Sequence, residues 1–229
     1  MNPGTARQYN SAYGQYGPPP RDDSLFGTLI KPNIVTYGII VACVIVFIWE
    51  MIDLESLSLL AMWPEYPMPW MFVTSIFMHG GFEHIFFNML MLFMFGVTLE
   101  RMLGNWRFLG LFLAAGIAGN VGYVMFCLAT GSDDPAIGAS GAIYGVFACL
   151  AVLAPQIKVY LFMIIPLKIF YAFLLYAAID IIFLNSNDSV AHAAHLAGAV
   201  VGVAFALYIR KKIMEAQAQR VSYQFVTDY

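Results

Sequence analysis

Long apolar stretches separated by short polar segments run through the chain from residue 33 to about residue 209. Six of these stretches approach the roughly 20 residues that an α-helix needs to cross a bilayer. They lie at about 33–52, 80–99, 106–128, 139–154, 159–184 and 191–209, the fifth with an early break at Pro166. The pattern predicts an all-α polytopic membrane protein, built as a bundle of six transmembrane helices.

Polar or irregular segments complete the chain. Residues 1–27 are rich in Gly, Pro, Tyr, Gln and Asn, a composition that buries no core and predicts a disordered tail. Residues 28–212 form the expected membrane domain, and residues 213–229 form a polar C-terminal tail. The stretch 56–78 is apolar, but its prolines stop a straight helix and its Trp and Tyr residues favour the membrane interface. We expect this stretch to be a loop in the outer headgroup region.

Basic residues all fall on one side of the membrane when six spans are drawn. The loops after the first, third and fifth spans contain no Lys or Arg. The positive-inside rule then places both termini in the cytoplasm, and we expect an integral multi-pass protein of a bacterial plasma (inner) membrane. With 61% hydrophobic and 11% charged residues, the chain leaves no room for a large soluble domain, and no nucleic-acid partner is expected.

The fourth span is short, which sets the depth of Ser140. About 15 residues separate Ser140 from Pro155, roughly 22 Å of helix against a hydrocarbon core of roughly 30 Å. Ser140 is therefore expected below the outer surface, and the segment 131–135 is expected to dip into the membrane beside a water-filled pit. His195 and Asn88 lie at similar helical distances from the basic residues that end their own spans, so all three are expected at one depth.

Small residues in the fourth and sixth spans favour close contact between these two helices. Gly141 and Gly145 are four residues apart in one span, and Gly198 and Gly202 are four apart in the other. Such spacing lets backbones approach in lipid, where van der Waals packing drives helix association. Each pair begins within one helical turn below the serine or the histidine, so this packing would bring the two side chains together.

Polar residues inside apolar spans are costly and mark candidate functional sites. A serine hydroxyl becomes nucleophilic when a base removes its proton, and the imidazole of His195 is a suitable base for Ser140. His84 and Asn88 lie four residues apart on one face of the second span, where both could donate to an oxyanion. Tyr144, one turn below the serine, is placed to pack against the imidazole. Taken singly, each of these residues has an alternative role in helix packing or interhelical hydrogen bonding.

Two further polar residues leave alternatives open. We expect Asp180, in the fifth span, to be a polar partner between helices or to face the cavity; the alternative is a triad acid that orients His195. We expect His192, one turn above His195, to lie at the surface or behind the site rather than to be catalytic. The three cysteines lack metal-ligand spacing, and the histidines lack the signature of a zinc protease, so we expect no metal and no cofactor.

Three motifs together resemble the rhomboid family of intramembrane serine proteases. They are His79-x4-His84-x3-Asn88, then Gly138-x-Ser140-Gly141 with Tyr144, then Ala194-His195-x2-Gly198-x3-Gly202. The resemblance covers the second to sixth spans. It implies a six-helix bundle with a membrane-embedded first loop, which corresponds to the stretch 56–78.

The resemblance also implies a function and roles for the residues. Ser140 would be the nucleophile and His195 the base of a dyad without a third acid, with His84 and Asn88 binding the oxyanion. The supporting residues would be His79, Tyr144, Gly138, Gly141 and Gly198. The implied activity is hydrolysis of peptide bonds in or near the transmembrane segments of single-pass membrane proteins, amid membrane lipids, from a site open to the outer face. The alternative is a catalytically inactive relative that binds membrane helices, and the sequence leaves the oligomeric state open.

Overall fold

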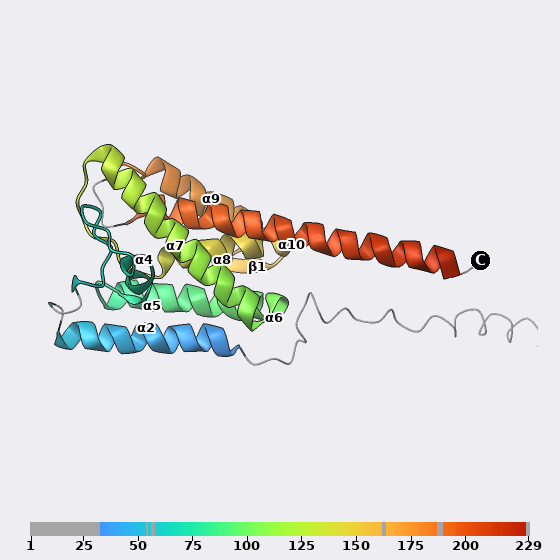
Figure 1. The fold of residues 1–229 in the computed structure, drawn as a ribbon, viewed down its shortest axis with the longest axis horizontal. Helices are drawn as coiled ribbons and strands as arrows, with labels where there is room; N and C mark the ends of the chain where they lie inside the picture. Colours follow the sequence, from blue (N-terminus) through green and yellow to red (C-terminus); the bar gives the residue numbers. More distant parts are fainter. Residues whose placement is uncertain (1–32, 54, 56–57, 162–163, 187–189, 228–229) are drawn as a thin grey trace, which may run out of the picture.

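The computed structural model describes residues 33–227 except 54, 56–57, 162–163 and 187–189, so the tail predicted at 1–27 lies outside the described residues. The helices α2, α5 and α10 run along roughly one direction, and α10 extends well past the others (Figure 1). In chain order the elements are α2 (Ile34–Ile52), α4 (Met71–Thr74), the 3₁₀ helix η1 (Ser75–Phe77), α5 (Phe82–Met91), the π-helix η2 (Leu92–Gly96), α6 (Val97–Leu103), α7 (Asn105–Thr130), α8 (Ser140–Leu153), β1 (Lys158–Leu161), β2 (Ile165–Lys168), α9 (Ile169–Ile182) and α10 (His192–Thr227).

Four helical stretches among the described residues are long and apolar enough to cross a membrane. They are α2, the continuous run of α5, η2 and α6, then α7, and the part of α10 from His192 to Ala218. The apolar helices α8 and α9 have 14 residues each, fewer than the roughly 20 of a full span. The predicted helical membrane bundle is therefore confirmed, with four candidate spans and two shorter apolar helices.

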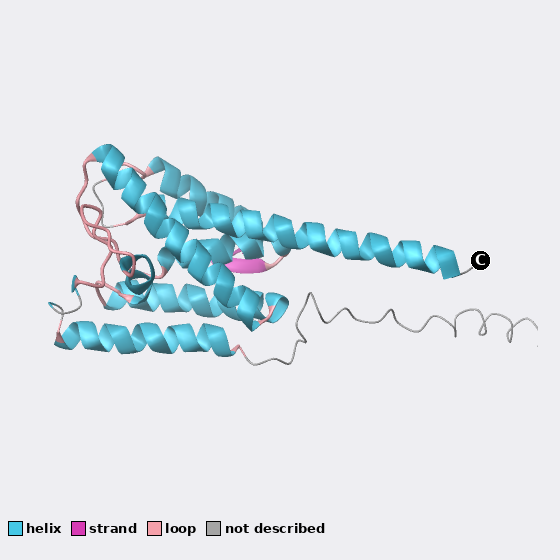
Figure 2. Ribbon diagram, viewed as in Figure 1, coloured by secondary structure: helices cyan, strands magenta, loops and turns pink. Residues whose placement is uncertain are grey.

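The predicted start of the fifth span is wrong, because residues 158–161 and 165–168 form a pair of β-strands (Figure 2). The two strands pair antiparallel, with Tyr160 opposite Pro166. Proline disfavours helical backbone in the residue before it and cannot complete a helical hydrogen bond, whereas β-branched and aromatic neighbours favour a strand. The helix α9 therefore begins only at Ile169, and the fold is helical with one small pair of strands rather than purely α.

The polar C-terminal tail predicted at 213–229 is helical as far as it is described, because α10 continues without a break to Thr227. Its exposed face carries pairs that suit a helix surface. The ammonium groups of Lys211 and Lys212 lie 4.0 and 3.5 Å from the carboxylate of Glu215. Pairs three and four residues apart meet on one helical face, so charged residues prolong this helix beyond its apolar part.

The helix α8 lies at the centre of the bundle, packed between α7 and α10. Between Gly141 and Ala151 it is buried at every position except Tyr144. A Cβ atom on Gly198 would clash with the carbonyl oxygen of Gly141, and one on Gly202 would clash with that of Gly145. Only glycine permits this approach, so the predicted close contact between the two glycine pairs is confirmed.

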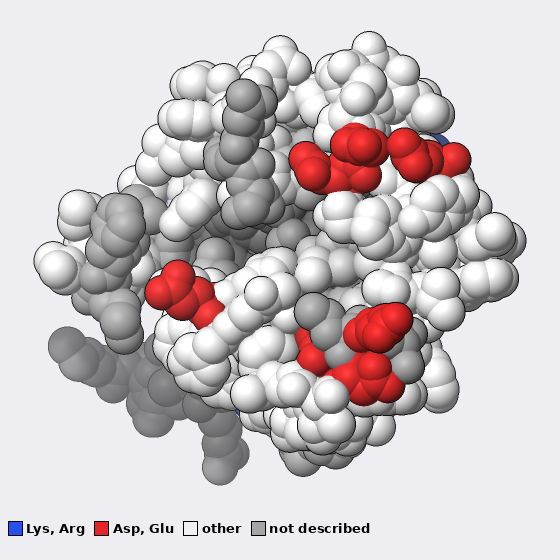
Figure 3. Space-filling view, turned by 90° about the vertical axis from the view of Figure 1, so that its left-hand side faces the viewer, with Lys and Arg blue, Asp and Glu red and all other residues white. Residues whose placement is uncertain are grey.

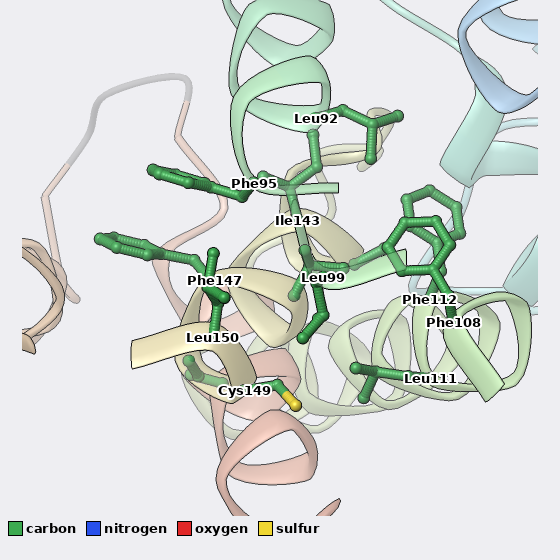
Figure 4. Close-up of a cluster of buried hydrophobic side chains, with 14 of the residues drawn as sticks. Leu92, Phe95, Leu99, Phe108, Leu111, Phe112, Ile143, Phe147, Cys149 and Leu150 are labelled. Atoms are coloured by element: carbon green, nitrogen blue, oxygen red, sulfur yellow. The ribbon is translucent and has the colours of Figure 1, made fainter. Parts of the chain in front are cut away.

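Aliphatic and aromatic side chains fill the core between α8 and the helical run of α5, η2 and α6 (Figure 4). The ring of Phe95, on the π-helix, stacks on the ring of Phe147 with centroids 4.6 Å apart. Phe147 also meets Phe173 of α9 edge-on at 5.6 Å. This cluster joins three helices directly below the position of Ser140.

A buried carboxylate joins the end of α6 to the start of α2. Glu100 accepts hydrogen bonds from the backbone N–H groups of Val35 and Thr36 at 3.0 and 2.8 Å, and from the Thr36 hydroxyl at 2.6 Å. The first N–H groups of a helix have no partner within the helix, so the carboxylate satisfies them and favours the positive end of the helix dipole.

The segment between α2 and α5 holds the chain that leads into α8. Met62 and Ala136 exchange two backbone hydrogen bonds of 3.0 and 2.9 Å. The backbone N–H of Gly138 donates to the carbonyl of Ser75 at 2.9 Å. The residues before Ser140 are therefore tied to this segment at two points, which fixes where α8 begins.

Candidate active site

A cavity of about 1120 Å³ lies among α5, α8, α9 and α10. Five residues singled out from the sequence line it: Ser140, His195, His84, Asn88 and Tyr144. The rest of the wall is largely apolar, and Glu83 and Asp134 belong to it where the helices end. Figure 3 shows that this end of the bundle is hollowed, with acidic side chains around it and almost no basic ones.

Ser140 is the first residue of α8 and is partly exposed in the cavity wall. The N–H groups of a first helical turn lack partners within the helix, so the backbone at Ser140 is available to bind an anion. Gly138 precedes it with a φ of +120°, and a Cβ atom there would lie 2.7 Å from the imidazole of His84. Glycine at this position therefore lets the His84 ring lie against the backbone that leads to the serine.

His84 and Asn88 reach the cavity from successive turns of α5. The amide nitrogen of Asn88 donates one hydrogen bond, of 2.9 Å, to the carbonyl of His84. An Asn side chain has two N–H groups, so the second remains to donate toward the cavity. The arrangement supplies two side-chain donors opposite the serine.

His195 lies in the first turns of α10, with only 8% of its surface exposed. Its imidazole stacks on the ring of Tyr144, with centroids 4.2 Å apart and planes 10° apart. Its Nδ1 lies 3.0 Å from Oδ1 of Asp180. Since Nδ1 faces the carboxylate, Nε2 is the nitrogen left to act on a partner in the cavity.

Asp180 and His192 occupy places that the sequence only partly predicted. Asp180 is buried and joins α9 to α10, as expected of a polar partner between helices, but one of its partners is His195 itself. His192 is buried rather than at the surface, and its Nδ1 lies 2.6 Å from the same Oδ1. The available signal was a lone acid in an apolar helix together with two histidines three residues apart, which share one helical face.

His79 lies behind the site, with 1% of its surface exposed. Its backbone N–H donates to the carboxylate of Glu50 at 3.0 Å, and its Nδ1 lies 3.3 Å from the carbonyl of Phe77. The ring meets that of His84 edge-on at 5.1 Å. Burial, aided by the nearby His84, lowers the pKa of His79 from 6.5 to about 4, so this imidazole is neutral at physiological pH.

Known proteins resemble this chain across its membrane domain. Residues 66–212 match the family model of the Rhomboid domain. The chain is 36% identical to the mitochondrial Rhomboid protein 1 of Saccharomyces cerevisiae over 152 residues, which is 65% of the chain. It is 43% identical to the Putative rhomboid protease YdcA of Bacillus subtilis over 97 residues, and 42% identical to the Rhomboid protease GluP of the same bacterium over 85 residues, covering 42% and 37% of the chain.

These relatives are longer than the part that they share with the chain. The matched segments cover 44% of the yeast protein, 42% of YdcA and 16% of GluP. The likeness therefore concerns the membrane domain and not the whole of each relative.

Proposed function

The chain belongs to the rhomboid family, and on this premise we propose that it is an intramembrane serine endopeptidase. Its substrates are single-pass membrane proteins, cut in or near their transmembrane helices. The observation that carries the proposal is the single cavity wall shared by Ser140, His195, His84 and Asn88. Nucleophile, base and oxyanion donors come from three helices and face one volume, which is the arrangement that acyl transfer requires.

The reaction begins when Nε2 of His195 takes the proton of the Ser140 hydroxyl. The serine oxygen then forms a bond to the carbonyl carbon of the scissile peptide, and the carbonyl oxygen becomes an oxyanion. Stacking on Tyr144 holds the imidazole plane during this transfer. The side chains of His84 and Asn88, together with the backbone N–H at Ser140, donate to the oxyanion and stabilise it.

The tetrahedral intermediate collapses when the bond between carbon and nitrogen breaks. His195 returns its proton to the leaving amine, which departs as the new amino terminus. A water molecule then attacks the acyl-enzyme, gives its proton to His195 and releases the carboxyl product, and the proton finally returns to Ser140. A cavity of about 1120 Å³ with polar residues in its wall has room for this water.

The proposal includes a membrane topology. Six elements cross the bilayer of a bacterial plasma membrane, with α8 and α9 as short spans and both termini in the cytoplasm. Two observations support it: the loops next to the cavity carry acidic residues, and the opposite ends carry the Lys and Arg residues. In this topology the short α8 would start below the outer surface, so that Ser140 would meet water that enters the cavity from outside.

Purified protein in liposomes, given a fluorescent transmembrane substrate, tests the activity. We expect cleavage that EDTA leaves intact and that Ser140→Ala and His195→Ala each abolish. Ser132→Ala, a serine in the loop before α8 that does not line the cavity, is the matched control and should cleave normally. A labelled fluorophosphonate should attach to Ser140 in the wild type.

Three outcomes would contradict the proposal. Cleavage by Ser140→Ala at the wild-type rate would show that Ser140 is not the nucleophile. Loss of cleavage in EDTA would indicate that the reaction needs a metal ion. A wild-type protein that binds the substrate helix without cutting it, and that leaves Ser140 unlabelled, would instead be an inactive member of the family.

A further inference from the structure

The carboxylate of Asp180 lies behind the imidazole of His195, on the side away from the cavity. Its Oδ1 lies 3.0 Å from Nδ1 of His195, and Asp180 is 2% exposed. His195 belongs to the cavity wall, whereas Asp180 does not. The imidazole therefore stands between the carboxylate and the volume that Ser140 faces, in the order that a serine, histidine and acid relay requires.

We propose that Asp180 is a positioning residue for the catalytic base, so that this chain uses a Ser140–His195–Asp180 triad rather than a dyad. The inference rests on the proposed protease function and deepens it. The carboxylate accepts the Nδ1–H of His195, which fixes the tautomer whose Nε2 lone pair is free to act in the cavity that Ser140 also lines. When Nε2 takes the serine proton, the nearby anion stabilises the imidazolium that forms; Asp180 itself keeps its charge.

His192 holds the carboxylate in place. Its Nδ1 lies 2.6 Å from the same Oδ1, so a second imidazole donates to the oxygen that His195 uses. Both histidines are on α10 and Asp180 is on α9, so the two contacts fix the rotation of α9 against α10. The carboxylate can then move little relative to His195. A general base must be held in one orientation, and a fixed carboxylate helps to hold it.

Among the titratable groups around His195, Asp180 is the one placed to stabilise a positive charge on the imidazole by direct contact. The titratable groups that face the imidazole are the phenol of Tyr144 on α8, His84 on α5 and His192 on its own helix. The phenol of Tyr144 also faces Asp180, and the carboxylates of Glu83 and Asp134 lie across the cavity wall. Asp180 is thus the carboxylate in direct contact with the base.

The test compares Asp180→Asn with the wild type in liposomes at several pH values. Asn has nearly the same shape but no charge and can donate toward Nδ1, which favours the wrong tautomer of His195. We expect kcat to fall about 100-fold or more, with KM changed by less than about threefold. The acid limb of kcat/KM should move to lower pH, and fluorophosphonate labelling of Ser140 should slow in parallel.

Glu100→Gln is the matched control, because it also neutralises a buried carboxylate in a membrane helix. Glu100 bonds to the start of α2 and not to the cavity residues. Glu100→Gln should lower the thermal stability but leave the acid limb of kcat/KM where the wild type has it. Asp180→Asn should lower the stability and also move the acid limb, which a merely structural role would not do. His192→Asn, which leaves the contact between Asp180 and His195 in place, should reduce kcat by less than about tenfold.

A second test uses only the wild-type protein, so it does not depend on whether a variant folds. Nitrogen-15 spectra of labelled histidine should show neutral His195 protonated on Nδ1, with Nε2 unprotonated. The reverse tautomer would overturn the proposal. So would an Asp180→Asn variant that keeps its fold, more than about a third of the wild-type kcat and the wild-type acid limb.

Three results separate this proposal from others. Full cleavage by Ser140→Ala would contradict the proposed serine protease function itself. An inactive Ser140→Ala variant together with a fully active Asp180→Asn variant would contradict only the positioning role of Asp180. Ligand atoms of Asp180, His192 and His195 all lie within 4.8 Å of one another, a set that a metal ion could also use. Activity that EDTA abolishes and Zn²⁺ restores would assign the cluster to a metal and overturn the positioning role.

Discussion

The imidazole of His195 and the phenol ring of Tyr144 lie face to face, with centroids 4.2 Å apart and planes tilted by 10°. The two rings come from neighbouring helices, α10 and α8, whose backbones touch through glycines. The stack closes one face of the imidazole, and the contact with Asp180 fixes its Nδ1 edge. The remaining nitrogen therefore has one direction in which to act, toward the cavity.

Shortening Tyr144 should reveal how much this stack contributes. Tyr144→Ala removes the ring, and we expect kcat to fall about tenfold or more, because an aromatic pair is worth roughly 0.5–1.5 kcal/mol beyond its buried area and also orients the base. Tyr144→Phe keeps the ring and should stay within about fivefold of the wild type. Steady-state cleavage in liposomes measures both. A Phe variant as poor as the Ala variant would transfer the role from the ring to the hydroxyl.

Glycine at position 198 should be essential for the bundle. A Cβ atom there clashes with the backbone carbonyl of Gly141, which cannot move aside as a side chain can. We expect Gly198→Ala to lower the free energy of unfolding in detergent by about 3 kcal/mol or more. Gly110→Ala is the matched control, because a Cβ atom on Gly110 meets nothing within 4 Å. Alanine favours a helix over glycine by about 1 kcal/mol, so Gly110→Ala should be neutral or stabilising. Equal melting temperatures for the two variants would contradict close packing of α8 on α10.

Position 138 should affect activity more than stability. Gly138 has a φ of +120°, and a Cβ atom there would lie 2.7 Å from the His84 ring. We expect Gly138→Ala to displace His84 and to lower kcat about 100-fold, the usual cost of losing an oxyanion donor. Gly131→Ala separates backbone strain from displacement, since Gly131 has a φ of +78° and nothing within 4 Å of its added Cβ atom. Gly131→Ala should therefore lose stability but keep kcat, measured with the same liposome substrate. Similar kcat values for both variants would exclude displacement of His84 as the cause.

Acid should destabilise the fold through His79. Its pKa is about 4 in the folded protein and 6.5 as the ordinary value, so the unfolded chain binds more protons between these limits. Stability from the neutral, buried imidazole is thus complete above pH 6.5 and falls as the pH drops toward 4, by up to about 3 kcal/mol. Melting temperatures across this range should show a shallower decline for His79→Gln than for the wild type. Parallel curves would contradict the assignment to His79.

Much of this protein was determined by the sequence alone. Apolar runs predicted the membrane bundle, and glycines four residues apart predicted the contact of α8 with α10. The spacing of Asn88, Ser140 and His195 predicted one common depth, because a helix has a constant rise per residue, and His84 was predicted one turn from Asn88 on the same helical face. All four line one cavity in the structure. These features depend on composition and on distances along single helices, which the sequence contains directly.

Other features were decided only by the tertiary structure. The pairing of residues 158–161 with 165–168 is a contact between two segments, which the apolar pattern along the chain does not register. The continuation of α10 past residue 212 was missed for a different reason, since the apolar pattern ends where the charged residues begin. The partner of Asp180 depends on the rotation of α9 about its axis, and sequence position specifies depth along a helix but not which neighbour it faces. Packing of side chains from several helices sets that rotation, and it brings Asp180 against His195 rather than into the cavity.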